Sequence, residues 1–381
     1  METQSKSSLY SQLEIPDYLS FTNDSLQAMD YHELYQYSIN EKEKFWAEQA
    51  LMLKWFKEPS TILSKDEKGF YHWFADGEMN TCYLCLDFHV DQGRGEQTAL
   101  IYDSPVSGVV KKYSYSDLKN AVAKFAGGLQ SLEIAKGDTV VIYMPVIPEA
   151  LIAMLACARI GAIHSVVFGG FAPHELSIRI DDAKPKAVIS ASFGVEINKV
   201  IPYKPLVDEA IKNAEHEPAY KIFFQRKENY DVLNGKDELD FSNVLENGIA
   251  TDCIPLRSTD PLYILYTSGT TGEPKGIIRD NGGYATALKF SMQYFYNVDP
   301  GDIFWAASDI GRVVGHSYMI YGPLLHGCTT IMYEGKPVKT PDAGAFWRVI
   351  AQHKVKTLFT APAAIRAMKR EDPEGKFFKP I

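Results

Sequence analysis

The stretch YTSGTTGEPKG, residues 266–276, concentrates side chains and glycines that could hold a phosphate. It contains a lysine, Lys275, four hydroxyls and three glycines, which are Thr267, Ser268, Thr270, Thr271, Gly269, Gly272 and Gly276. It is not a P-loop, because Pro274 precedes the lysine where that motif needs a glycine, and Gly276 follows it where the motif needs a hydroxyl. Glycines let backbone N–H groups converge on a phosphate without interference from Cβ atoms. The stretch therefore predicts a phosphate cradle; the alternative is a flexible surface turn.

The apolar run PLYILYT directly before this loop predicts a strand at 261–267. Similar runs predict strands at 138–146, 162–168, 186–192, 302–308, 328–333 and 355–360. Helical spacing and helix-start residues predict helices within 31–56 and at 148–161, 173–183, 342–353 and 361–370, with Asp342 as the N-cap of the fourth. This alternation predicts an α/β fold with mainly parallel sheets flanked by helices, which binds ligands at the carboxyl ends of its strands. Residues 211–258 show no clear period.

The bulk composition excludes several classes of protein. The 381 residues are 46% hydrophobic and 23% charged, as in ordinary globular proteins. The net charge of −9 argues against nucleic acid as a partner, since non-specific binding to phosphates needs basic surfaces. No run is long and apolar enough to span a membrane, and the N-terminus lacks the features of a signal or transit peptide, so we expect no membrane partner and a cytoplasmic location.

Five cysteines give no disulfide framework. Cys82 and Cys85 form a C-x-x-C pair, but a zinc site needs two more ligands and the nearby His89 supplies at most one. We therefore predict buried packing cysteines and no metal site formed by protein ligands.

Four stretches resemble a known family. YTSGTTGEPKG resembles the signature of the adenylate-forming superfamily, and the segments 140–171, 179–192 and 308–337 resemble its short-chain acyl-CoA synthetases, the acetyl- and propionyl-CoA synthetase group. TPDAGAFWRVIAQH (340–353) and VVGH (313–316) resemble the propionyl branch more closely. The resemblance implies a two-step ligase. A carboxylate attacks the α-phosphorus of ATP to give an acyl-adenylate and pyrophosphate, and the thiol of CoA then releases AMP.

The resemblance also implies roles for individual residues. ATP phosphates and Mg²⁺ would be bound by the loop, through Thr267, Ser268, Gly269, Thr270, Thr271, Gly272 and Lys275. The pocket for propionate or acetate would be lined by Arg312, Val313, Val314, Gly315 and His316, with Arg312 standing where similar enzymes usually have Trp. The nucleotide end of CoA would lie near Gly169, Gly170, Glu196 and Lys199. From the residues alone, paired valines and a lone histidine more often serve packing than catalysis, so no catalytic residue is assigned.

The same resemblance divides the chain into a poorly ordered lead-in (1–30), a helical and irregular segment of the acetyl-CoA synthetase type (31–88) and an AMP-binding domain (89–381). The family's later motifs do not occur in the sequence, so we expect an incomplete AMP-binding domain, no small C-terminal domain, and a chain that is inactive by itself. Two alternatives remain open. One is a nucleotide- or CoA-binding pseudoenzyme with a regulatory or assembly role; the other is an adenylating enzyme that transfers its acyl group to a carrier protein.

Overall fold

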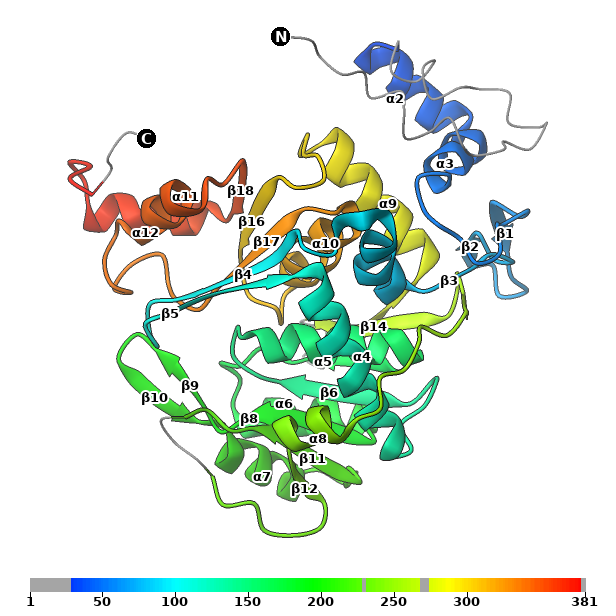
Figure 1. Cartoon of the computed structure of the whole chain (residues 1–381). Helices are drawn as coiled ribbons and strands as arrows, with labels where there is room; N and C mark the ends of the chain where they lie inside the picture. Colours follow the sequence, from blue (N-terminus) through cyan, green and yellow to red (C-terminus); the bar gives the residue numbers. More distant parts are fainter. Residues whose placement is uncertain (1–28, 228–230, 268–273, 378–381) are drawn as a thin grey trace.

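The structure is a computed structural model that describes residues 29–227, 231–267 and 274–377. Two sheets form the body of the protein (Figure 1). The larger sheet has seven strands in the order β12-β11-β8-β6-β7-β14-β15, and every neighbouring pair is parallel except β14–β15. Its strands are β6 (Thr139–Tyr143), β7 (Ile163–Val166), β8 (Ala187–Ala191), β11 (Tyr220–Phe224), β12 (Glu238–Asp240), β14 (Pro261–Thr267) and β15 (Lys275–Asp280).

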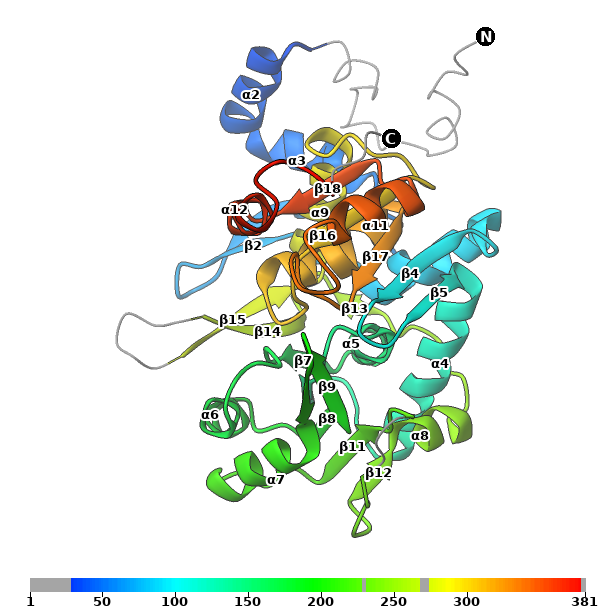
Figure 2. The ribbon, with the colours of Figure 1, turned by 90° about the vertical axis from the view of Figure 1, so that its left-hand side faces the viewer.

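The smaller sheet has five strands in the order β18-β16-β17-β4-β5, and only the β4–β5 pair is antiparallel. Its strands are β4 (Thr98–Ser104), β5 (Val109–Ser114), β16 (Ile303–Ala307), β17 (Thr329–Tyr333) and β18 (Thr357–Thr360). Figure 2 shows this sheet above the larger one, with α5 (Pro148–Ile160) between them. The predicted α/β fold with mainly parallel sheets is therefore confirmed.

Helices cover both faces of the larger sheet. Successive side chains of its buried strands point to opposite faces, so apolar side chains on each face pack against helices. On β6, Val140 and Ile142 belong to the core that includes α5, whereas Val141 and Tyr143 belong to the core under α6 (Pro173–Ala183) and α7 (Tyr203–Asn213). The helix α4 (Tyr115–Ser131) packs along α5. These layers hold the carboxyl ends of the parallel strands at one edge.

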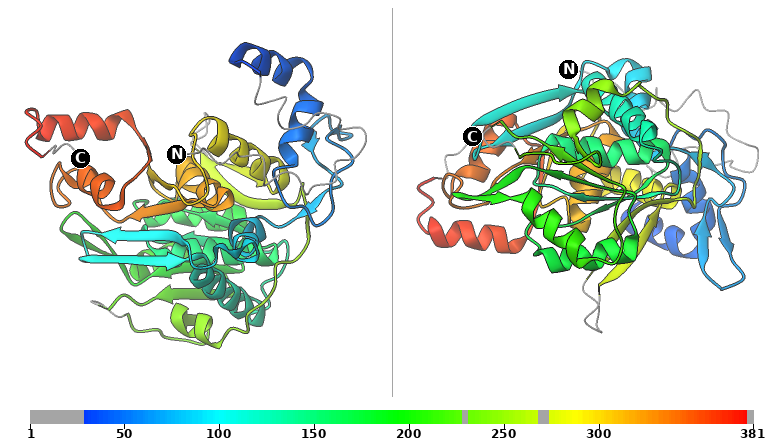
Figure 3. Two further views of the ribbon diagram at one scale, coloured as in Figure 1. Left: turned by 45° about the horizontal axis from the view of Figure 1, so that its top comes forward. Right: turned by 90° about the horizontal axis from the view of Figure 1, so that it is seen from below.

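The smaller sheet is covered in the same way. Trp305, Ile331 and Phe346 belong to the core under α11 (Ala345–His353) and α12 (Pro362–Glu371). The opposite face joins the main core through η4 (Gly315–Tyr321, a π-helical turn), α9 (Gly282–Tyr294) and α10 (Gly322–His326). Figure 3 shows α11 and α12 at one end of the molecule and the N-terminal elements at the other.

The remaining elements are short. They are α2 (Tyr31–Asn40), α3 (Lys42–Ala50), β1 (Leu63–Lys65), β2 (Tyr71–Trp73), β3 (Glu78–Met79), η2 (Tyr83–Asp87), η3 (Val90–Arg94), β9 (Phe193–Glu196), β10 (Lys199–Pro202), α8 (Phe241–Asn247) and β13 (Leu256–Arg257). β1–β2, β3–β13 and β9–β10 are separate antiparallel pairs. Within the described ranges, none of the helices has the length and apolar character that crossing a membrane requires.

Two details of the sequence prediction are corrected. Asp342 is not the N-cap of α11: its Oδ1 accepts the Gly344 N–H at 2.7 Å in a turn, and the helix begins at Ala345 after Gly344. The stretch 211–258, which showed no period, contains β11, β12, α8 and β13. The sequence of β11 does not alternate between apolar and polar residues, because both faces of this strand are covered. A short apolar run fits a buried strand and a buried helix equally well, so the sequence pattern does not identify it.

Candidate active-site cleft

A cleft of about 250 Å³ lies where the carboxyl ends of the strands of both sheets meet. Its walls include residues that follow β6 and β7 in the larger sheet and residues at the ends of β16 and β17 in the smaller one; the hairpin β9–β10 closes one side. The segments that contribute are 144–146, 168–170, 194–197, 307–309 and 334–337. Open α/β sheets bind their ligands at this edge, so the cleft is the candidate active site.

A buried ion pair at this cleft joins the two sheets. Glu334 follows β17, and its two carboxylate oxygens accept from the two terminal nitrogens of Arg226, which follows β11, at 2.6 and 3.1 Å. The hydroxyl of Ser104 donates to the same carboxylate at 2.8 Å, and that of Tyr102 donates to it as well. Glu334 is only 5% exposed and Arg226 7%. Since a buried carboxylate must be fully paired, this network fixes the distance between the sheets at the cleft.

A second, exposed ion pair lies at the mouth of the cleft. The Glu196 carboxylate on β9 lies 3.3 Å from the Lys336 ammonium, which follows β17 in the other sheet. Both side chains are about half exposed. Glu196, predicted near CoA, thus lines the cleft with its charge already paired. Lys199 faces Glu196 across the hairpin but is exposed and is not part of the cleft wall.

Gly169 and Gly170 line the cleft as the resemblance implies. A Cβ on Gly169 would lie 2.2 Å from the Tyr203 hydroxyl oxygen, and one on Gly170 would lie 2.5 Å from the ring of Phe168. Both contacts are shorter than van der Waals packing allows. Glycine therefore lets this loop lie flat against its neighbours and leaves the cleft open.

The segment after β16 brings one of the predicted acyl-pocket residues, Arg312, beside this loop, but none of the five residues 312–316 lines the cleft. The Arg312 guanidinium lies over the ring of Phe168, with its carbon 4.9 Å from the ring centre. Gly315 is buried, and a Cβ there would lie 1.9 Å from the backbone oxygen of Asp309. Val313 is 48% exposed, whereas Val314 packs against the main core. Burial raises the pKa of Asp309, whose carboxylate accepts the Gly311 N–H at 2.8 Å and lines the cleft.

His316 is a buried member of an aromatic stack. Its ring centre lies 4.6 Å from that of Tyr263 and 5.6 Å from that of His164, and its Nδ1 lies 3.1 Å from the backbone oxygen of Arg312. Burial lowers its pKa to about 4, so the ring is neutral at pH 7. It is fully enclosed, with no exposed surface to meet a substrate. The geometry supports a packing role rather than acid–base catalysis.

The predicted phosphate loop joins β14 to β15. Thr267 ends β14 and Lys275 begins β15, and the two face each other across the hairpin. Ser268, Gly269, Thr270, Thr271 and Gly272 lie outside the described residues. β14 runs parallel to β7, so Thr267 falls at the same edge of the sheet as the loop 168–170. Within the described part of the chain, the exposed Lys275 makes no salt bridge.

The base of this hairpin is held on α6. The hydroxyl of Tyr266 donates to the Asp182 carboxylate at 2.6 Å, and the Arg179 guanidinium lies 5.5 Å from the centre of the Tyr266 ring. Burial, with the adjacent Asp182 carboxylate, raises the pKa of Tyr266 above its usual value, so the hydroxyl stays protonated as a donor. The structure therefore fixes where the loop begins.

Sequence reasoning missed three charged residues that line the cleft and the arginine that pairs with one of them. Asp309 and Glu334 come directly after predicted apolar strands and Lys336 follows within three residues, and this position is a signal that could have found them. Arg226 follows a strand that the sequence pattern did not reveal, and it had no such signal.

Comparison with known proteins accounts for this architecture. Residues 88–379 match the AMP-binding enzyme family, and residues 31–85 match the acetyl-coenzyme A synthetase N-terminus. The chain belongs to the AMP-binding enzyme family. Among curated proteins, the chain is similar to the human mitochondrial acyl-CoA synthetase short-chain family member 3, which is 50% identical over 90% of this chain and 50% of its own length. The propionate–CoA ligase of Salmonella typhimurium is 44% identical over 90% of this chain and 54% of its own length.

The fold agrees with this family. The acetoacetyl-CoA synthetase from Streptomyces lividans superposes with a TM-score of 0.81 at 22% identity, covering 90% of this chain and 52% of that one. This AMP-binding enzyme chain thus spans about half the length of the relatives that it matches.

ATP and CoA are the ligands that this family implies, and the described residues offer cations to such anions in Lys275, Arg312 and Lys336. A Mg²⁺ ion bound directly by the carboxylates of Glu334 and Glu196 is not favoured, because these carboxylates already pair with Arg226 and Lys336. An ion here would be held mainly by the phosphates of the nucleotide, as Mg²⁺ commonly is, and would supply positive charge to them. Among the described residues, the group of three side chains suited to a metal is Cys82, Asp87 and Cys253, none of which lines the cleft.

Proposed function

We propose that the protein is a short-chain acyl-CoA synthetase that forms an acyl-adenylate from ATP and propionate or acetate, and then acyl-CoA with release of AMP. The match of residues 88–379 to the AMP-binding enzyme family carries this proposal. The adjoining match of residues 31–85 to the acetyl-coenzyme A synthetase N-terminus supports a CoA-dependent second step. The name of the Salmonella relative supports propionate as the preferred acid.

The chemistry asks the protein for positioning and charge rather than for a base. A short carboxylic acid is ionised at neutral pH, so its oxygen attacks the α-phosphorus without losing a proton first. Negative charge then accumulates on the departing pyrophosphate, and preorganised cations and N–H donors stabilise it. Lys275 and Thr267 stand at the ends of the phosphate hairpin to do this. The neutral, enclosed His316 agrees with a first step that needs no acid or base.

The tight glycine loop explains how the cleft admits two large anions in turn. Gly169 and Gly170 present backbone instead of side chains at its wall, which leaves backbone N–H groups accessible to a phosphate or carboxylate. Arg312 beside this loop adds a guanidinium, whose planar donors suit both groups. We assign Arg312 to the carboxylate of the acid or to the phosphate of the adenylate.

A second candidate is a nucleotide- or CoA-binding pseudoenzyme. The pairing of Glu196 with Lys336 favours it, since this pairing neutralises a lysine that would otherwise bind a CoA phosphate. The two candidates differ in product formation and not in nucleotide binding.

The test incubates the 381-residue chain with MgATP, CoA and acetate, propionate or butyrate, and measures AMP and acyl-CoA by mass spectrometry. Acid-dependent AMP and acyl-CoA, highest with propionate, would support the ligase. MgATP binding without either product, measured by calorimetry at the same protein concentration, is expected both for the pseudoenzyme and for a ligase chain that is inactive by itself, and would count against ligase activity of this chain alone.

A matched pair of variants tests the phosphate site. Lys275→Ala should weaken MgATP binding by about tenfold or more, since a charge-assisted hydrogen bond contributes about 1.5–3 kcal/mol. Lys112→Ala, which removes another exposed lysine from a different sheet, should leave binding unchanged. Equal binding by both variants would remove Lys275 from the site.

A further inference from the structure

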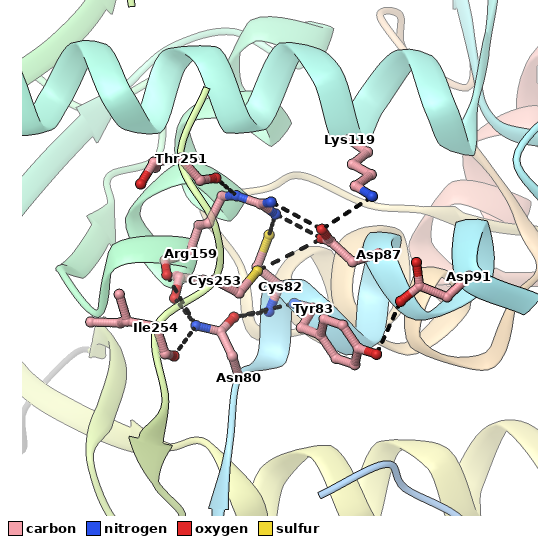
Figure 4. Close-up of polar contacts among 11 residues, drawn as sticks. Asn80, Cys82, Tyr83, Asp87, Asp91, Lys119, Arg159, Thr251, Cys253 and Ile254 are labelled. Carbon is pink, nitrogen blue, oxygen red and sulfur yellow. Dashed lines mark hydrogen bonds and ion pairs between the residues drawn. The ribbon is translucent and has the colours of Figure 1, made fainter. Parts of the chain in front are cut away.

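Two cysteines far apart in the sequence meet beside α5 (Figure 4). Cys82 immediately precedes η2, Cys253 lies between α8 and β13, and both sulfurs lie with an oxygen of Asp87 in a group whose members are all within 4.8 Å of one another. The Cys253 thiol donates to Asp87 Oδ2 at 3.7 Å. Cys82 is fully buried, whereas Cys253 is partly exposed. In the sequence, Cys82 stands in a C-x-x-C spacing with Cys85, for which we predicted only a packing role.

Cys85 does not take part in this group. Its sulfur is directed at the backbone oxygen of Tyr321, 3.8 Å away, and it is fully buried. Cys157 and Cys328 are buried elsewhere in the core. Among the described residues, the structure therefore singles out Cys82 and Cys253 as the pair of thiols with one partner reachable from solvent.

Positive charge surrounds the pair. The Arg159 guanidinium donates to both oxygens of Asp87, at 2.7 and 2.9 Å, and its Nη1 lies 3.6 Å from the Cys82 sulfur (Figure 4). The Lys119 ammonium is 3.6 Å from the same carboxylate. Arg159 and Lys119 thus both pair with the Asp87 carboxylate. Their positive charge would repel a metal ion at this position. Burial, the neighbouring Cys82 and the Asp87 carboxylate raise the pKa of Cys253, so this residue is present as a thiol and the oxidation relies on the proximity of the two sulfurs.

Backbone contacts fix the two cysteine segments against each other. The Asn80 side-chain amide donates to the backbone oxygens of Ala158, Arg159 and Ile254, at 3.1, 3.1 and 2.9 Å. The backbone N–H of Ile254 also donates to the backbone oxygen of Arg159, at 3.1 Å. The residues next to both cysteines are therefore anchored to the same end of α5, and the proximity of the sulfurs does not depend on flexible side chains alone.

From this geometry we infer that Cys82 and Cys253 are a site of reversible oxidation, in which a small peroxide converts the two thiols into an intramolecular disulfide. Both S–H bonds and the O–O bond of hydrogen peroxide break, one S–S bond forms, and the two thiol hydrogens leave in two molecules of water. The thiols lose two electrons and the peroxide gains them. A thiol reductant restores both S–H groups. The inference is independent of the proposed ligase activity.

The test treats the folded chain with one equivalent of hydrogen peroxide, blocks free thiols with N-ethylmaleimide in denaturant, and maps non-reduced peptides by mass spectrometry. We expect a cross-linked pair of peptides containing Cys82 and Cys253, lighter by two hydrogen atoms than the two reduced peptides together. Cys85, Cys157 and Cys328 should carry the maleimide. Dithiothreitol should abolish the cross-link. A Cys82–Cys85 cross-link, an intermolecular disulfide, or full alkylation of Cys253 would overturn the inference.

Variants and zinc provide the controls. Cys253→Ser alters the partly exposed partner and should abolish the cross-link, whereas Cys85→Ser should retain it. Because the experiment on the unaltered chain needs no substitution, misfolding of a variant cannot decide the result. Zinc ions alone, added before the peroxide, should neither bind at one equivalent nor protect the thiols. Stoichiometric zinc binding that Cys253→Ser abolishes would replace the oxidation site by a metal site.

Discussion

Replacing Arg226 by Met tests whether the buried ion pair holds the two sheets together at the cleft. The change leaves the Glu334 carboxylate buried, with the Tyr102 and Ser104 hydroxyls as its remaining donors among the contacts described above. Removing one partner of a buried pair costs about 3–5 kcal/mol, because the other charge stays desolvated and uncompensated. Both side chains are under a tenth exposed, so solvent screens little of this loss. The two remaining donors place the expected loss near the lower end, at about 3 kcal/mol.

The assay is urea unfolding followed by tryptophan fluorescence, with the free energy of unfolding compared between the parent chain and Arg226→Met. The matched control is Lys336→Met, which breaks the pair with Glu196 at the mouth of the same cleft. Because both members of that pair are about half exposed, their attraction contributes at most about 1 kcal/mol. High salt should reduce the small effect of the control further and leave the Arg226 effect nearly unchanged.

The double variant Arg226→Met, Glu334→Gln makes the reasoning refutable. If an unpaired buried charge causes the loss, neutralising that charge should recover much of it, so the double variant should be more stable than Arg226→Met alone. Equal losses for Arg226→Met and Lys336→Met, or no recovery in the double variant, would show that lost packing of the arginine side chain causes the effect.

Two further predictions concern the segment after β16. Burial lowers the pKa of His316 from an ordinary 6.5 to about 4. The free energy of unfolding that this residue contributes is therefore fully present above pH 6.5 and is lost as the pH drops toward 4. The loss due to His316 is about 2 kcal/mol at pH 5. His316→Asn should therefore lose less stability than the parent chain when the pH is lowered from 7.5 to 5. An equal decrease in the urea unfolding midpoint for the two chains would contradict this. Gly315→Ala should lower the thermal midpoint by several degrees because its Cβ would meet a rigid backbone oxygen of Asp309. Gly169→Ala, which meets the movable Tyr203 hydroxyl, should lower it less, and calorimetry distinguishes the two.

The fold was largely predictable because its strands are short apolar runs that end in polar or glycine-rich turns. The segments 138–146, 186–192 and 328–333 each contain a strand of a parallel sheet, as their composition indicated. The segments to which the sequence analysis assigned no element include 98–131, which forms β4, β5 and α4, and 211–258. β12 has only three residues and its side chains are half-buried, so neither length nor alternation identifies it. Its place beside β11 is set by tertiary pairing, and tertiary context often decides a strand that local propensity leaves open.

The candidate site was predictable only where its residues adjoin local motifs. Gly169, Gly170 and Arg312 stand in or next to motifs; the structure places the two glycines in the cleft wall and Arg312 over the ring of Phe168. The pairing of Arg226 with Glu334 joins positions 108 residues apart, and no pattern along the chain records such a contact. Asp342 shows the converse: a residue type suited to an N-cap lies two residues before the N-cap position and accepts a hydrogen bond from Gly344 in a turn.

Charge pairing across the cleft decides how far a motif-based assignment can be carried over. Glu196 stands in a segment that the resemblance links to CoA, and a carboxylate by itself would repel the phosphates of CoA. Because Lys336, from the segment after β17, neutralises it, the repulsion is reduced, but a cation that the phosphates would otherwise use is taken up by this ion pair. Lys199, exposed on the facing strand, is the cation that the proposed site for that end of CoA would retain. The affinity of the proposed site for CoA should therefore depend on Lys199 more than on Lys336, a division of roles that follows from the ion pair between the β9–β10 hairpin and the segment after β17 and not from either motif alone.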